Sequence, residues 1–80
     1  MKMDTNLTYQ TSDFYETAVL YSAGMKLVNT SHSGQRINFY FNDFNNCESV
    51  IKKYFAHELK IDAMDLIDAI KTVKTLIFRR

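Results

Sequence analysis

Apolar and polar residues alternate along two neighbouring segments in the middle of the chain, Met25–Thr30 and Gln35–Phe41. Alternation with a period of two is typical of strands that bury one face, so both segments are predicted to be strands. The residues between them end with Gly34, which can adopt the left-handed backbone that tight hairpin turns require. The pattern therefore predicts a β-hairpin.

The register of this hairpin depends on the length of its loop. A three-residue loop over His32–Gly34 would place Leu27 opposite Phe39 and Met25 opposite Phe41. A two-residue loop over Ser33 and Gly34 would instead set Lys26 opposite Phe41 on the same face. Because a slip of one residue exchanges the two faces of a strand, the apolar match favours the three-residue loop.

Apolar residues recur at helical spacing in three other segments, and each segment is preceded by a residue that can cap a helix. Asp13 precedes the first segment, with Glu16 three residues on in the capping-box position. Asn45 precedes the second segment, and Asp62 precedes the third. Three helices are therefore predicted, the last of them running nearly to the end of the chain.

The predicted elements define the fold class. A short strand over Leu7–Gln10 comes before the first helix, so the order is β-α-β-β-α-α. The chain is predicted to be one small α+β domain over residues 1–80, with residues 1–6 disordered. Its two- to three-stranded, mainly antiparallel sheet should carry the helices packed on one face.

The two faces of the hairpin differ in chemistry. Three large apolar side chains share one face and are predicted to fill the core: Ile37, Phe39 and Phe41. The favoured register sets Lys26 opposite Tyr40 on the other face. The candidate partner residues on that face are Lys26, Arg36, Asn38 and Tyr40. This face is either a solvated sheet surface or a contact surface for nucleic acid, a protein partner or a second copy of the chain, which would make a homodimer.

The C-terminal segment carries a second candidate surface. Its cations, which would contact phosphates, are Lys71, Lys74, Arg79 and Arg80. The alternative is structural, because Asp62 and Asp65 stand at the start of the same predicted helix. Anions at the start and cations at the end complement the helix macrodipole.

No combination of residues in the chain predicts catalysis. Cys47 lies near a predicted helix start, but a cysteine nucleophile needs a positioned base, and neither His32 nor His57 is tied to it. Cys47 is therefore predicted to be a small buried residue. One cysteine and two separated histidines lack zinc-site spacing, and two glycines cannot form a phosphate-binding glycine-rich loop. We expect no enzymatic activity, no cofactor and no metal site.

Composition narrows the setting of the protein. The formal net charge of +1 argues against a strongly basic nucleic-acid-binding protein, although a local basic patch remains compatible with it. The first ten residues lack the apolar region of a secretory signal, and no apolar run approaches the ~20 residues of a membrane span. The single cysteine fits a reducing compartment. A cytoplasmic protein without membrane contact is the expectation.

Three stretches of the chain carry a family resemblance: TSDFYETAVLYSAGMKL, RINFYFND and IDAMDLIDAIKTVKTLI. With these stretches, which cover most of Thr11–Ile77, the chain resembles a family of small bacterial and phage-borne domains of unknown function. The resemblance implies an α+β fold and a setting among phages and other mobile elements. It implies no catalytic motif and no activity.

The sequence thus favours a non-enzymatic interaction module, encoded by a phage or another mobile element, that binds a host or phage protein. The alternative is a small nucleic-acid-binding protein that uses the basic and aromatic sheet face or the basic end of the last helix. The partner itself cannot be named from these residues.

Overall fold

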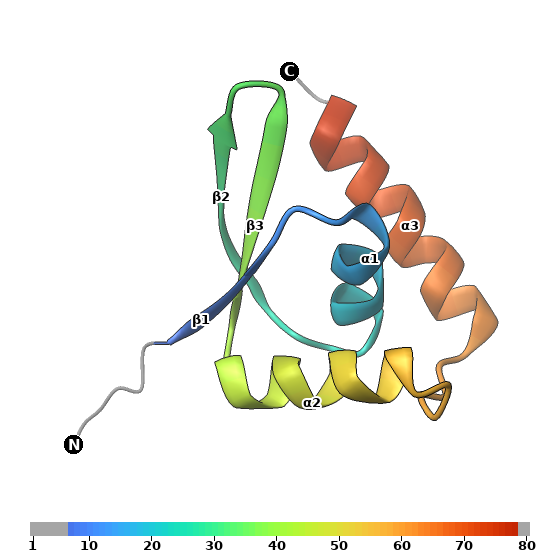
Figure 1. Ribbon diagram of the computed structural model, residues 1–80. Helices are drawn as coiled ribbons and strands as arrows, with labels where there is room; N and C mark the ends of the chain where they lie inside the picture. The colour runs from blue at the N-terminus through green and yellow to red at the C-terminus, as the bar shows by residue number, and fades with distance from the viewer. Residues whose placement is uncertain (1–6, 79–80) are drawn as a thin grey trace.

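The computed structural model describes residues 7–78, which form three strands and three helices in the order β-α-β-β-α-α (Figure 1). The elements are β1 (Thr8–Thr11), α1 (Phe14–Ser22), β2 (Leu27–Ser33), β3 (Arg36–Asn42), α2 (Phe44–Phe55) and α3 (Ala63–Phe78). The α+β class and the order of elements are as predicted. The expected disorder of residues 1–6 lies outside the described residues.

The sheet has the strand order β1-β3-β2, and both neighbouring pairs are antiparallel. The central strand β3 is the one with the most complete alternation of apolar and polar residues. Its partner β1 is only four residues long, and it pairs with the second half of β3, from Thr11 opposite Phe39 to Thr8 opposite Asn42. The first half of β3 is therefore paired on one side only.

The predicted register of the hairpin is wrong. Ser33 pairs with Arg36, so the turn contains two residues, Gly34 and Gln35, rather than the three expected. The φ angle of Gly34 is +65°, and a positive φ at the first central residue is what a type II′ hairpin turn requires. The turn is compatible with the twist of the strands and needs no longer loop.

A β-bulge explains how the apolar residues still reach the core. Phe39 lies opposite Thr30, but the register shifts by one residue at Val28, so that Leu27 lies opposite Phe41. A bulge adds one residue to one strand and exchanges its faces beyond that point. The side chain of His32 shares the core side of the sheet but is exposed, so the tip of the hairpin imposes no need for apolar residues.

The core lies between the sheet and the helices. Figure 1 shows α1 and α3 beside the hairpin and α2 across its base. The buried residues of the core cluster are Ala18, Leu20, Phe39, Phe41, Cys47, Ile51, Ala69 and Val73. All three helices thus contribute to one cluster on one side of the sheet, as predicted, and Phe39 and Phe41 are its largest buried side chains.

Two of the three predicted helix caps are confirmed. The Asp13 carboxylate accepts a hydrogen bond of 2.8 Å from the Glu16 amide, and the Asp62 carboxylate accepts one of 2.9 Å from the Met64 amide. The cap of α2 is Asp43 rather than the predicted Asn45. Asp43 accepts a hydrogen bond from the Asn46 amide, with its backbone in the left-handed region at φ 72°.

Candidate functional site

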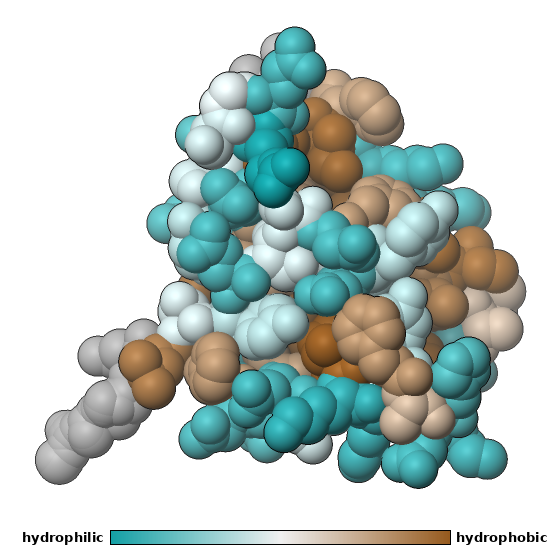
Figure 2. Space-filling model, in the orientation of Figure 1, coloured by the Kyte–Doolittle hydropathy of each residue, from teal (hydrophilic) through white to brown (hydrophobic). Residues whose placement is uncertain are grey.

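One face of the sheet is covered by no helix among the described residues. Strand alternation directs Arg36, Asn38 and Tyr40 away from the core, and the observed register sets Ser33, Ser31 and Asn29 opposite them. We call this surface the open sheet face. Its residues are Thr8, Gln10, Asn29, Ser31, Ser33, Arg36, Asn38, Tyr40 and Asn42. In the space-filling view, mainly hydrophilic residues cover the hairpin side of the molecule (Figure 2).

Tyr40 lies at the centre of the open sheet face. Its ring is half-buried, and its hydroxyl is 3.1 Å from the Ser31 hydroxyl on β2, a hydrogen bond in which either group can donate. This contact runs diagonally across the strand pair, because the residue directly opposite Tyr40 is Asn29. The Tyr40 side chain is therefore tied to β2 by its hydroxyl, and part of it remains exposed to solvent.

Lys26 does not lie opposite Tyr40 as predicted, but beside Asn42 at the end of the open sheet face. Its carbonyl oxygen accepts a hydrogen bond of 2.8 Å from the Asn42 amide, which places its backbone beside the end of β3 rather than opposite Tyr40. Arg36 begins the same strand, so the two cations lie at opposite ends of it, roughly 20 Å apart at about 3.4 Å per residue. Arg36, Asn38 and Tyr40 share one face as predicted, whereas the expected pairing of Lys26 is wrong.

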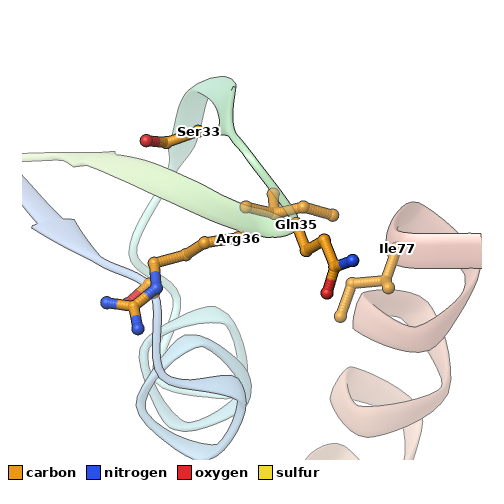
Figure 3. A pocket seen from close by; sticks show the side chains of 6 residues that line it. Ser33, Gln35, Arg36 and Ile77 are labelled. Atoms are coloured by element: carbon orange, nitrogen blue, oxygen red, sulfur yellow. The ribbon is translucent and has the colours of Figure 1, made fainter.

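A hollow of about 540 Å³ lies beside the first half of β3, between the hairpin tip and α3. We call it the Arg36 hollow, and it is lined by Ser12, Ser33, Gln35, Arg36, Ile37 and Ile77. In Figure 3, Gln35 points toward Ile77, whereas Arg36 points away from α3. Arg36 is the only charged residue of the lining. Ile37 and Ile77 supply its apolar part, and the remaining three side chains can donate and accept hydrogen bonds.

The sequence did not reveal this hollow. Ser12 and Ile77 are separated by most of the chain, and they meet only because α3 runs back toward the hairpin tip (Figure 1). No local pattern reports that approach. The one available signal is the unequal length of the strands, because a short β1 leaves part of β3 without a neighbour.

The candidate phosphate contacts of the last helix lie apart from the sheet. Lys71 and Lys74 are both exposed on α3, and neither lines the Arg36 hollow. The carbonyl oxygen of Lys71 accepts a hydrogen bond of 3.0 Å from the Thr75 hydroxyl, within the helix. Arg79 and Arg80 lie outside the described residues. The cations that the structure describes are thus dispersed over several surfaces.

Cys47 is buried, as predicted. Its thiol donates a hydrogen bond of 3.3 Å to the carbonyl oxygen of Asn42, and burial, with a smaller effect of the nearby Asp43 carboxylate, raises the pKa of Cys47 to about 11. A thiol held protonated and away from solvent is a poor nucleophile. Within residues 7–78 no three metal-ligating side chains come together, and no helix there is both long and apolar enough to cross a bilayer.

A polar network joins β1 to α1 on the core side of the sheet. One oxygen of the Glu16 carboxylate accepts hydrogen bonds from the Tyr9 hydroxyl at 3.2 Å and the Thr11 hydroxyl at 3.0 Å. Burial and the adjacent Glu16 raise the pKa of Tyr9 to about 12. This network therefore holds protonated hydroxyls around one carboxylate and stabilises the junction of the two elements.

The fold defines a small α+β domain with one uncovered sheet face, and comparison with known proteins places it in a family. The chain matches the family described as domain of unknown function DUF5659 over residues 6–79, and it belongs to that family. No curated protein and no solved structure matches the chain.

Proposed function

We propose that this domain is a non-enzymatic interaction module that binds another protein through the open sheet face. The observation that supports the proposal is a sheet surface without a covering helix, centred on the half-buried Tyr40. The face carries hydroxyl and amide side chains, one aromatic ring and one guanidinium. Cys47 is buried, and no three metal-ligating side chains cluster within residues 7–78. Neither feature points to a reaction.

The composition of the open sheet face favours a protein partner. Tyrosine and arginine are enriched at protein interfaces, and tyrosine, serine and asparagine together dominate adaptable polar binding surfaces such as antibody paratopes. Of the nine strand residues that define the open sheet face, only Arg36 is charged, and Lys26 adds one more cation beside Asn42 at its far end. A surface of this kind offers many hydrogen bonds and has little electrostatic repulsion to overcome.

The nucleic-acid alternative has less support. A binding surface for a phosphate backbone needs several cations along one path, together with exposed rings on which bases can stack. Lys26 and Arg36 lie at opposite ends of the hairpin, and Lys71 and Lys74 lie on α3. Phe39 and Phe41 are buried, so they offer no ring to a base.

The proposed setting is a phage or another mobile element within a bacterial cytoplasm, and the proposed partner is a host or phage protein. This setting is supported by the family resemblance that residues 11–77 carry. A second copy of the chain is the other protein partner that the open sheet face could accommodate. The molar mass of the purified protein in solution distinguishes these two partners.

The experiment uses the full chain as bait in a host lysate, followed by reconstitution with the purified partner and measurement of its Kd. The double variant Asn38→Lys and Tyr40→Ala changes two side chains of the open sheet face and none of the side chains that line the Arg36 hollow. Loss of a central aromatic contact should weaken binding by roughly tenfold or more.

The matched control makes comparable changes elsewhere on the surface, one tyrosine to alanine and one small polar residue to lysine. Tyr15 is 61% exposed on α1 and Ser49 is exposed on α2, so Tyr15→Ala with Ser49→Lys should leave the Kd unchanged. Retention of no protein, or equal weakening by both double variants, refutes the proposal. Capture of nucleic acid whose binding falls steeply with salt would instead favour the alternative.

A further inference from the structure

Part of the sheet edge beside β3 lacks a strand. β1 pairs with residues 39–42, and its last pair is Thr11 opposite Phe39. Arg36, Ile37 and Asn38 therefore have a neighbour only on the β2 side. The Arg36 hollow lies in the space into which β1 would extend, because Ser12, the residue directly after β1, forms one of its walls.

Main-chain groups of Ile37 face this space. Ser33 and Arg36 close a two-residue hairpin, so they exchange hydrogen bonds, and in an antiparallel pair such residues alternate along the strand. Arg36 and Asn38 thus bond to β2, and the Asn42 amide donates on the same side to the carbonyl of Lys26, the residue before β2. The amide and carbonyl of Ile37 point to the opposite edge, where an added strand would meet them.

The chemistry of the Arg36 hollow differs on the two sides of this edge. Arg36 and Ser33 belong to the open sheet face, whereas Ile37 and Ile77 lie on the core side. Successive side chains of an extended segment point to opposite sides. A segment beside β3 would therefore direct one side chain toward Arg36 and its neighbours toward the isoleucines.

We propose that the Arg36 hollow binds an extended segment of a partner protein, which adds to the edge of β3 in line with β1 and places an acidic side chain on Arg36 between aliphatic neighbours. Charge complementarity supports this occupant, because the lining has one cation and no anion. A guanidinium binds a carboxylate with two parallel hydrogen bonds, and added strands are a recurring mode of peptide recognition. The inference rests on the proposed function, in that the ligand is part of a protein.

The probe is a pool of capped pentapeptides with a central glutamate flanked by valine, isoleucine or threonine. A second pool carries glutamine at the centre, so the pools differ only in charge. Titration into the isotopically labelled full chain should shift the amide signals of Ser12, Gln35 and Ile37. Because a charge-assisted pair is lost, the glutamine pool should bind roughly tenfold more weakly.

Arg36→Gln should weaken binding of the glutamate pool by a similar factor and leave binding of the glutamine pool unchanged. Lys26→Gln removes the same charge at the other end of the hairpin, outside the Arg36 hollow, and should have no effect. Equal binding of the two pools, signal shifts outside the hollow, or indifference to Arg36→Gln overturns the proposal. Shifts of the same three amides by a uridine oligonucleotide, with none from the glutamate pool, overturn it as well.

A second copy of the chain is a further outcome. A molar mass of twice 9.4 kDa that falls to the monomer value in Arg36→Gln would assign the Arg36 hollow to self-association and overturn the peptide proposal. Failure of the peptides alone leaves the open sheet face intact, because its test alters Asn38 and Tyr40. If the test of the open sheet face fails but the glutamate peptides still bind, the Arg36 hollow is a site independent of the open sheet face.

Discussion

The Tyr9 hydroxyl donates a hydrogen bond of 3.2 Å to the Glu16 carboxylate and thereby ties the first strand to the first helix. The same carboxylate oxygen accepts from the Thr11 hydroxyl, and the Thr11 hydroxyl accepts in turn from the Asp13 amide at 3.1 Å. The capping box expected between Asp13 and Glu16 is therefore formed only in part. Asp13 caps the helix, but the Glu16 side chain serves β1 instead of returning to the cap.

Glu16→Ala should destabilise the domain by about 1–3 kcal/mol, because it leaves the hydroxyls of Tyr9 and the buried Thr11 without their acceptor. Glu16→Gln keeps an acceptor oxygen and should cost less. Urea unfolding followed by circular dichroism measures both values. Glu48, an exposed glutamate of α2, supplies the control, and Glu48→Ala should change the free energy of unfolding by less than about 0.5 kcal/mol. Equal losses for both alanine variants would contradict the role of the network.

Alkaline pH should destabilise the fold in two overlapping steps. The pKa of Cys47 rises from 9.0 to about 11 in the folded protein, and that of Tyr9 rises from 10.0 to about 12. Each group therefore loses its proton more readily in the unfolded chain, and the free energy of unfolding falls as the pH rises. The stabilising contribution of each protonated group is complete below pH 9.0 for Cys47 and below pH 10.0 for Tyr9. It is lost as the pH approaches the pKa of that group in the folded protein.

Urea midpoints measured from neutral pH upward test this prediction. Cys47→Ala should remove the part of the decline that begins near pH 9.0, and Tyr9→Phe should remove the part that begins near pH 10.0. Comparison with the parent protein at each pH isolates these two groups from the lysines, which titrate in the same range. Parallel pH curves for the parent and both variants would show that neither group is linked to folding.

The sequence predicts β3 well because physical constraints act on all of it. Ile37, Phe39 and Phe41 must face the helices, so the alternation is complete and divides the strand correctly into two faces. The caps Asp13 and Asp62 are likewise set by neighbours three residues away or fewer. Features that depend on close neighbours in the chain are therefore the ones that the pattern predicts.

The register of β2 depends on features that the pattern does not contain. Matching of apolar residues assumes that every core-side position is buried, yet Thr30 and His32 are exposed near the hairpin tip. The bulge at Val28 then corrects the face of Leu27 without leaving any signal in the alternation. Residue type alone does not distinguish a residue inserted as a bulge from a residue paired in the strand.

The candidate site was predicted only where it lies on a single strand. Arg36, Asn38 and Tyr40 follow from the alternation of β3, but their neighbours on the open sheet face depend on the register, which was wrong. The Arg36 hollow also requires the direction of α3, because Ile77 forms its far wall. Long-range packing determines that direction, and a single sequence carries no local record of it.

Asp43→Ala should destabilise the domain by about 1–3 kcal/mol, because it removes the cap of α2 and places alanine in the left-handed region at φ 72°. Asp43→Gly loses the same cap but accommodates the backbone, so it should cost less than the alanine variant. Urea unfolding gives the order of the two. Asn45→Ala should be nearly neutral, because Asn45 is exposed and does not cap the helix. A larger loss of stability for Asn45→Ala than for Asp43→Ala would instead identify Asn45 as the cap of α2.

The hairpin turn gives the sharpest test of the observed register. Gly34→Ala should cost about 1–2 kcal/mol, because φ is +65° there while the space around an added Cβ is empty to 4 Å, so that the whole cost lies in the backbone. Gly34→Asn should cost less, since asparagine tolerates the left-handed region. Gln35→Ala, the control at the second turn position, should be nearly neutral because Gln35 lacks a positive φ.

Thermal unfolding ranks the three variants, and cross-strand nuclear Overhauser contacts between Ser33 and Arg36 report the register directly. Equal losses at the two turn positions, or contacts that join Ser31 to Gln35 instead, would contradict the two-residue turn.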